Sequence, residues 1–349
     1  MRGLERGARA LSLAILPLTL LAGCRQTAPS RPSPGVSTAA STLTWKVLRE
    51  APTGRTEVAA AASGGRVYVV GGFVEGGATV DTVEIYDTQR DTWVTGPALP
   101  IKVNHAMAAS NGDTIFVLGG YAGPGLEKPT DRAFVLIPET RHPDTPGPRG
   151  GHWQEIARMP EPRAAGGAAV ILGRIYVAGG IGPTGLADKT MVLDIPAAIS
   201  GTETVATWTT VPGVPTKREH LGVASDGKSV YVVGGRVDGN NLAATEAFDP
   251  ATGKWSRFED MPTPRGGLAA AATSNGFILA VGGEAQATFK EAEAFNVKTG
   301  NWTTMPTLPT ARHGLGVAAL GTIVYVIAGG PQPGYSFSGA NEAIDLSRV

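Results

Sequence analysis

Five arginines recur at one place of a repeated sequence frame and are the residues of this chain best suited to bind a ligand. Each stands three positions after a proline, which itself follows a tryptophan by seven positions: Arg55, Arg163, Arg218, Arg265 and Arg312. Val103 takes the sixth place. A guanidinium offers forked donors that match a carboxylate or a phosphate. The arginines therefore either form an anion-binding ring or have a structural role in the repeat.

Acidic residues that could absorb this positive charge recur farther along the same frame. They are Glu84, Glu246, Glu293 and Glu342. If each arginine bonds such an acid or nearby loop carbonyls, the ring belongs to the framework, because charges that leave water need partners. The residues alone leave both alternatives open.

Three histidines and two acids accompany the arginines. His105, His220 and His313 fall in alternate repeats, and three histidines could bind zinc with an open position. His313 directly follows its arginine, whereas the other two lie two places beyond the equivalent residue. Because side chains alternate in direction along a strand, the three should not converge, and we predict no metal or other cofactor. Glu219 beside His220 is the best acid–base pair, with Glu57 as a further acid.

The spacing of these residues comes from a sixfold internal repeat at intervals of about 50 residues, which is typical of propellers. One landmark is a tryptophan: Trp45, Trp93, Trp153, Trp208, Trp255 and Trp302. Another is a glycine pair that begins at Gly71, Gly119, Gly179, Gly234, Gly282 and Gly329. β-Rich runs such as 66–70 precede the pairs, and small-residue runs such as 58–62 suit an inner strand near a crowded axis. Four short antiparallel strands per repeat form a propeller blade.

This pattern resembles the Kelch repeat, which has a diglycine after its second strand, an aromatic residue in its third and a tryptophan in its fourth. The aromatic is Tyr86, Phe248 or Phe295 in three repeats, and aliphatic residues replace it in two others. The resemblance covers residues 43–349 and implies an all-β fold, a six-bladed Kelch-type β-propeller. In Kelch repeats similar arginines often bond loop carbonyls or acids, which favours the structural alternative.

The sequence also predicts how the ring closes. No tryptophan strand follows the last glycine pair, whereas residues 43–48 form a tryptophan strand without a blade of its own. Pairing this strand into the last blade would hide an exposed edge. The alternative is a five-bladed propeller with a stray strand. We expect deletion of residues 43–48 to open the ring and deletion of residues 27–38 to leave folding intact.

The N-terminal segment predicts export. Three arginines precede an apolar run at residues 10–22, which is too short to span a bilayer and ends in Leu-Ala-Gly-Cys24. That ending resembles the lipobox of bacterial lipoproteins and implies a lipid on Cys24. We predict a signal peptide at 1–24, a Pro/Ser/Thr-rich tether at 25–42 and the propeller at 43–349. The expected location is the outer membrane of a Gram-negative host, otherwise the outer face of the plasma membrane. An ordinary cleaved signal or an uncleaved anchor is the alternative.

We expect a monomeric, non-enzymatic binding module. It would recognise a protein segment or a glycan through one propeller face, and an acidic ligand would suit the arginines. Zero net charge argues against a nucleic-acid partner. We expect the protein to contact a membrane only through its lipid anchor. Contact regions could include the long loops at residues 138–152 and 196–207. The chain also resembles bacterial sialic-acid mutarotases, which implies an alternative carbohydrate enzyme using channel-mouth arginines and glutamates. Galactose-oxidase-like chemistry needs a cysteine other than Cys24 and is excluded.

Overall fold

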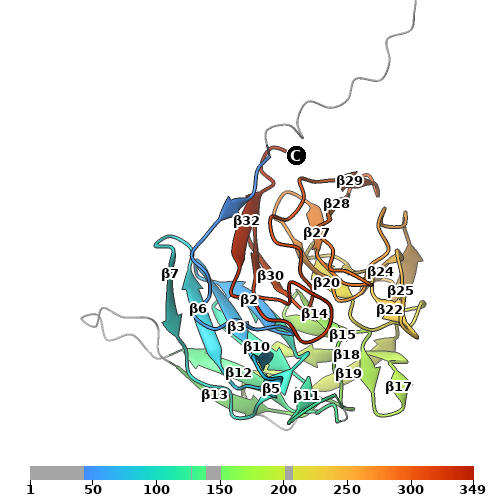
Figure 1. Cartoon of the computed structure of the whole chain (residues 1–349). Coiled ribbons are helices and arrows are strands. Elements are labelled where there is room, and N and C mark those ends of the chain that lie inside the picture. Colours follow the sequence, from blue (N-terminus) through green and yellow to red (C-terminus); the bar gives the residue numbers. More distant parts are fainter. Residues whose placement is uncertain (1–42, 127, 139–150, 201–206) are drawn as a thin grey trace, which may run out of the picture. The chain divides into compact units, whose positions relative to one another are not determined.

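The computed structural model describes residues 43–126, 128–138, 151–200 and 207–349. These residues form six four-stranded antiparallel sheets arranged as the blades of a propeller (Figure 1). The predicted all-β, six-bladed fold is confirmed. Within the described part, no helix has the length and apolar character needed to cross a bilayer. The predicted signal peptide and tether, including Cys24, lie outside the described residues.

Each blade runs from an inner to an outer strand. Blade one contains β2 (Ala59–Ser63), β3 (Arg66–Val70), β6 (Val83–Asp87) and β7 (Thr92–Thr95), and blade two contains β9 (Met107–Asn111), β10 (Thr114–Leu118), β12 (Ala133–Pro138) and β13 (Gly151–Ile156). Blade three contains β14 (Gly167–Ile171), β15 (Arg174–Ala178), β18 (Lys189–Asp194) and β19 (Trp208–Pro212), and blade four contains β20 (Gly222–Ser225), β21 (Val230–Val233), β24 (Thr245–Asp249) and β25 (Lys254–Arg257). Blade five contains β26 (Ala269–Ala272), β27 (Phe277–Val281), β28 (Ala292–Asn296) and β29 (Trp302–Thr304), and blade six contains β30 (Gly316–Leu320), β31 (Ile323–Ile327), β32 (Asn341–Asp345) and β1 (Lys46–Val47).

Among the residues that the structure describes, four short two-stranded ladders lie at the end of the blades where the inner strands begin. They are β4 (Phe73–Val74) with β5 (Ala78–Thr79), β8 (Val103–Asn104) with β11 (Tyr121–Ala122), β16 (Ile181–Gly182) with β17 (Gly185–Leu186), and β22 (Arg236–Val237) with β23 (Asn240–Asn241). One predicted loop is partly helical, because α1 (Ile195–Ser200) forms its first part. We call the propeller face that carries these ladders the diglycine face.

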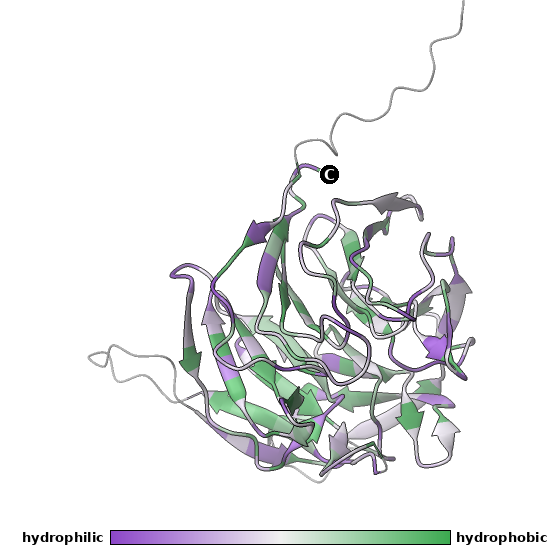
Figure 2. Cartoon of the chain, in the orientation of Figure 1, coloured by the Kyte–Doolittle hydropathy of each residue, from purple (hydrophilic) through white to green (hydrophobic). Residues whose placement is uncertain are grey.

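Small side chains let the inner strands approach the axis. Strand β26 is four alanines and β2 is four alanines and a serine, and each inner strand packs against those of both neighbouring blades. The inner strands enclose a central cavity of about 340 Å³. Larger apolar residues fill the spaces between blades, and Figure 2 shows green segments along the strands. The axis is therefore a narrow channel lined mainly by small residues.

Blade six takes its outer strand from the other end of the described chain. Lys46 and Val47 of β1 pair with Ala343 and Glu342 of β32. The Trp45 ring N–H donates to the Pro306 carbonyl at 2.7 Å. Residues more than 290 positions apart thus share one sheet.

The tryptophan landmark holds each outer strand to the preceding blade. Trp93 Nε1 donates to the Arg49 carbonyl at 2.9 Å, Trp153 Nε1 to Pro97 at 2.8 Å and Trp255 Nε1 to Pro212 at 2.9 Å. Trp153 is buried, and the ring N–H of a buried tryptophan needs such an acceptor.

The glycine pairs hold neighbouring blades together near the axis. The N–H of Gly120 donates to the Arg163 carbonyl of the next blade at 2.8 Å, and a Cβ on Gly119 would lie 2.2 Å from that oxygen. In blade six this contact is shifted by one position relative to the predicted glycine pair. Ala328 takes the positive φ (58°) of a first glycine, and the N–H of Gly329 donates to the Arg55 carbonyl. The landmark is therefore a close blade-to-blade contact.

We expect Gly119→Ala to destabilise the propeller more than Gly112→Ala. Both glycines have positive φ (60° and 57°), so each alanine adds strain of about 1–2 kcal/mol. Only at Gly119 would the new Cβ overlap a backbone oxygen, which adds about 1–3 kcal/mol, because nothing lies within 4 Å of a Cβ at Gly112. Urea unfolding of both variants measures the difference, and equal losses would contradict the contact.

Candidate functional site

All five arginines of the predicted ring are buried, at 0 % exposure, inside their own blades. The Arg55 guanidinium donates to the carbonyls of Gly71 (2.9 Å) and Thr82 (3.1 Å) and to Glu84 Oε2 (2.8 Å). In blades four, five and six the arginine pairs in the same way with Glu246, Glu293 and Glu342. These guanidiniums do not face solvent. The anion-binding interpretation of the arginines is therefore wrong, and the arginines could not contact a substrate in the carbohydrate-enzyme alternative.

Blades two and three show that each arginine and its acid form one unit. In blade three Met191 stands at the register position of the third-strand acid, and Arg163 pairs instead with Glu161, two positions before it. In blade two Val103 replaces the arginine, and Phe134 stands at the acid position. Val103 and Phe134 are both buried in one apolar cluster. Blades one, four, five and six therefore have a buried ion pair, blade two has a buried apolar pair, and blade three pairs its buried arginine with a partly exposed acid.

A ring of left-handed residues surrounds one end of the channel. The residue two positions past the arginine position has positive φ in every blade: Glu57 (53°), His105 (51°), Ala165 (52°), His220 (52°), Gly267 (70°) and Gly314 (57°). The N–H of His105 donates to the Glu57 carbonyl at 3.0 Å, and the next four residues continue in the same way around the axis. The N–H of Val58 completes the circle by donating to the Gly314 carbonyl at 3.3 Å.

Glu57 is the centre of a group of polar side chains on this ring. Its Oε2 lies 3.1 Å from His105 Nε2, and its Oε1 lies 3.2 Å from His313 Nδ1. The His105 and His220 rings meet edge to face with centroids 4.8 Å apart. The three histidines therefore do converge, contrary to the sequence prediction. The left-handed residue breaks the alternation of side chains on which that prediction was based.

A second layer of charged residues surrounds this group on the diglycine face. A Glu219 carboxylate oxygen contacts His220 Nδ1, and the other lies 2.8 Å from Arg236 Nε. Arg236 Nη1 lies 2.9 Å from Glu284 Oε1, and Glu284 Oε2 is 3.5 Å from His313 Nδ1. The predicted Glu219–His220 pair is therefore a real contact. We call these residues the axial cluster: Glu57, His105, Glu219, His220, Arg236, Glu284 and His313.

The environment shifts the pKa values of the cluster in opposite directions. Burial lowers the pKa of His105 and of His220, and neighbouring charges add to the lowering at His220. Burial opposes charge on Glu57 as well, but His105 and His313 outweigh it and hold the pKa of Glu57 below its usual range. Burial also disfavours charge on His313, yet Glu57 and Glu284 raise its pKa. The axial cluster thus contains three partly buried glutamates, and Arg236 is its one permanently charged cation.

Sequence reasoning missed Arg236 and Glu284 and did not place Glu57 beside the histidines. Arg236 and Glu284 each follow a glycine pair directly, so their position in the repeat was the available signal. The residues brought together are hydrogen-bonding and metal-ligating groups at a channel end, and no nucleophile with a matching base stands among them in the described residues.

Comparison with known proteins is consistent with this architecture. Residues 104–330 match the KLHDC2/KLHL20/DRC7 Kelch-repeats domain, and residues 54–100 match the Kelch motif. The chain is 29 % identical over 252 residues to the Kelch-like protein terF of Aspergillus terreus, covering 68 % of this chain and 51 % of that protein. It is 26 % identical over 193 residues to Kelch-like protein 40 of Xenopus tropicalis (55 % and 28 % covered) and 27 % identical over 179 residues to alpha-scruin of Limulus polyphemus (51 % and 18 % covered).

The chain spans about half or less of the length of these relatives, so the match concerns the propeller. The family model covers well over half of the chain, and the blades carry its landmarks. The chain belongs to the Kelch-repeat family.

Proposed function

We propose that this protein is an exported lipoprotein, acylated on Cys24, whose propeller binds a segment of a partner protein through the diglycine face. The repeat landmarks cannot perform this recognition, because arginines, tryptophans and glycine pairs are engaged within and between blades. Recognition falls to the loops after each glycine pair, which differ from blade to blade. Kelch propellers typically act as protein-interaction modules, which supports a protein partner.

An exposed aromatic residue beside the axial cluster carries this proposal. Tyr335 is 62 % exposed, and its ring stands edge to face on Phe73 at 5.1 Å. The loop before it is held in place, since Gly334 N–H donates to Glu284 Oε2 at 3.1 Å. Arg236 is partly exposed and contacts the same Glu284 carboxylate. A supported aromatic residue next to an arginine is the composition of a binding hot spot.

Cross-linking from the two faces tests the proposal. A photo-reactive amino acid replaces Tyr335 in the full chain, and the matched control replaces Leu172, which is 94 % exposed at a hairpin on the opposite face. We expect one discrete protein adduct from position 335, none from position 172, and recovery of the adduct in the membrane fraction. Cys24→Ser should move the protein to the soluble fraction without abolishing the adduct in a reconstituted mixture.

The outcomes separate the parts of the proposal. Equal labelling from both positions would overturn the assigned face. Absence of a protein adduct with binding on a glycan array would replace the protein partner by a carbohydrate. An unmodified Cys24 in the mass spectrum of the mature N-terminus would overturn acylation.

A further inference from the structure

The proton position on His105 leaves a lone pair facing a carboxylate. His105 Nδ1 lies 2.7 Å from Asn104 Oδ1. The Asn104 amide is oriented by its Nδ2, which donates to Thr79 Oγ1 at 3.0 Å and to the Gly125 carbonyl at 3.4 Å. Its Oδ1 can only accept, so the proton belongs on Nδ1. His105 Nε2 then presents its lone pair to Glu57 Oε2 at 3.1 Å, and two acceptors this close need a proton or a metal ion between them.

His220 is oriented in the same way. Its Nδ1 contacts the Glu219 carboxylate, which Arg236 holds from the other side. A carboxylate on one ring nitrogen fixes the tautomer that leaves Nε2 free, and metal-ligating histidines in proteins commonly have such a partner. His105 therefore has the outer hydrogen bond of a metal ligand, and His220 has a carboxylate against the corresponding ring nitrogen.

The three groups are spaced somewhat more widely than the ligands of a small metal ion. Glu57, His105 and His220 each offer one ligand atom, and these atoms all lie within 4.8 Å of one another. Ligand atoms around a tetrahedral zinc, with bonds of about 2.0–2.1 Å, stand about 3.3 Å apart. Side-chain movements of about 1 Å would complete that geometry.

Backbone strain at the same three residues is a separate observation. Among the six equivalent ring positions, blades five and six have glycine, which takes positive φ freely. Glu57, His105 and His220 take it at a cost of about 1 kcal/mol or more each. Ala165 of blade three also has positive φ (52°), so the strain does not by itself distinguish the candidate ligands, although all three of them carry it.

We propose that Glu57, His105 and His220 bind one divalent transition-metal ion of the zinc class at the end of the channel on the diglycine face. Two nitrogens and one carboxylate oxygen suit zinc or cobalt, whereas calcium and magnesium require mainly oxygen ligands. Three protein ligands leave a fourth position for water. The inference does not depend on the partner proposed above, since the site is complete within one chain.

Metal titration of the full chain tests this site. Cys24→Ser removes the one thiol of the sequence, a competing zinc ligand, and serves as the parent protein. After treatment with a chelator, calorimetry with Zn²⁺ should give one ion per chain, and Co²⁺ should give the visible absorption of a tetrahedral centre. Zn²⁺ should raise the melting temperature, and Ca²⁺ or Mg²⁺ at equal concentration should not.

Glycine variants separate metal binding from folding. His105→Gly with His220→Gly copies blades five and six and relieves two strained residues, so we expect the metal-free variant to keep the β-sheet circular dichroism of the parent. Zinc affinity should fall by on the order of 100-fold or more, since even outer-sphere changes cost about 10–100-fold. The matched control is His152→Gln, because His152 is exposed on β13.

Three results would overturn the proposal. Absence of zinc binding by the folded parent would mean that a proton alone occupies the space between His105 and Glu57. Unchanged affinity in the double glycine variant, or loss of affinity in His152→Gln, would place the ion elsewhere.

Discussion

Glu293→Leu is expected to destabilise the propeller by about 3–5 kcal/mol, because it leaves the Arg265 guanidinium buried without its counter-charge. Arg265 is 0 % exposed, and its Nη2 lies 2.8 Å from Glu293 Oε2. Thr263 Oγ1 donates to the other carboxylate oxygen at 2.7 Å and would lose its acceptor as well. Burial lowers the pKa of Arg265, an effect that the Glu293 charge opposes. Removing the acid therefore removes the main compensation for a buried cation.

Blade two supplies the control for this prediction. Its residues at the corresponding positions are Ile101, Val103 and Phe134, so the triple variant Thr263→Ile, Arg265→Val and Glu293→Phe copies an arrangement that the fold already contains. We expect the triple variant to recover most of the stability lost in Glu293→Leu. Urea unfolding of the parent, the single variants and the triple variant gives the coupling energy. A single variant as stable as the parent would refute the structural role of the pair.

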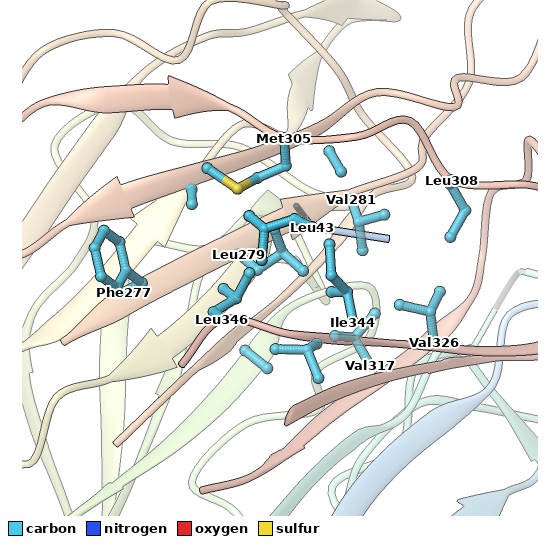
Figure 3. Close-up of a cluster of buried hydrophobic side chains, with 14 of the residues drawn as sticks. Leu43, Phe277, Leu279, Val281, Met305, Leu308, Val317, Val326, Ile344 and Leu346 are labelled. Atoms are coloured by element: carbon cyan, nitrogen blue, oxygen red, sulfur yellow. The ribbon is translucent and has the colours of Figure 1, made fainter. Parts of the chain in front are cut away.

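Leu43→Ala is expected to cost about 2–5 kcal/mol, although Leu43 precedes the first strand. Its side chain is buried between blades five and six, among Leu279, Ile344 and Leu346 (Figure 3). Deletion of residues 43–48 should cost more, because it also removes the β1–β32 ladder and the Trp45 hydrogen bond to Pro306. The expected result is a large drop in melting temperature with exposure of the β32 edge.

Val47→Ala is the matched control for Leu43→Ala. Val47 lies on the same strand segment but is 69 % exposed, so its truncation should change stability by no more than about 0.5 kcal/mol. Deletion of residues 27–38 should leave the melting temperature unchanged. Equal effects of the Leu43 and Val47 variants would show that the segment contributes only its backbone.

The fold could be predicted from the sequence because each landmark serves a contact that repeats in every blade. Trp93 needs a carbonyl of the preceding blade, and Gly119 must approach the next one, so neither residue can vary freely. The arginine role was also accessible in principle. In blade two the arginine position and the acid position are both apolar (Val103 and Phe134). In blade three, where the third-strand acid is missing, Arg163 has Glu161 two positions before it. Paired changes of this kind indicate that the arginine and the acid interact with each other.

The axial cluster could not be predicted in this way. Its geometry depends on the left-handed conformation of Glu57, His105 and His220, which these residue types seldom adopt and which no propensity predicts. Strand alternation therefore gave the wrong directions for the histidines. Arg236 and Glu284 come from loops after the glycine pairs, where the repeat imposes no residue type.

The shared blade six also sets an order for folding. Asn341 Nδ2 donates to the Arg49 carbonyl across 292 positions of sequence, and β1 pairs only with β32, so β1 has no partner strand until nearly all of the propeller has been synthesised. Contacts this remote are slow to form, because the entropy of closing the loop must be lost first. Blades one to five can assemble by local hairpins as the chain emerges, whereas the seam closes last. Until then the β32 edge can pair with any extended strand. The rate at which β1 pairs with β32, more than the stability of the finished propeller, would therefore govern how much of the protein escapes aggregation.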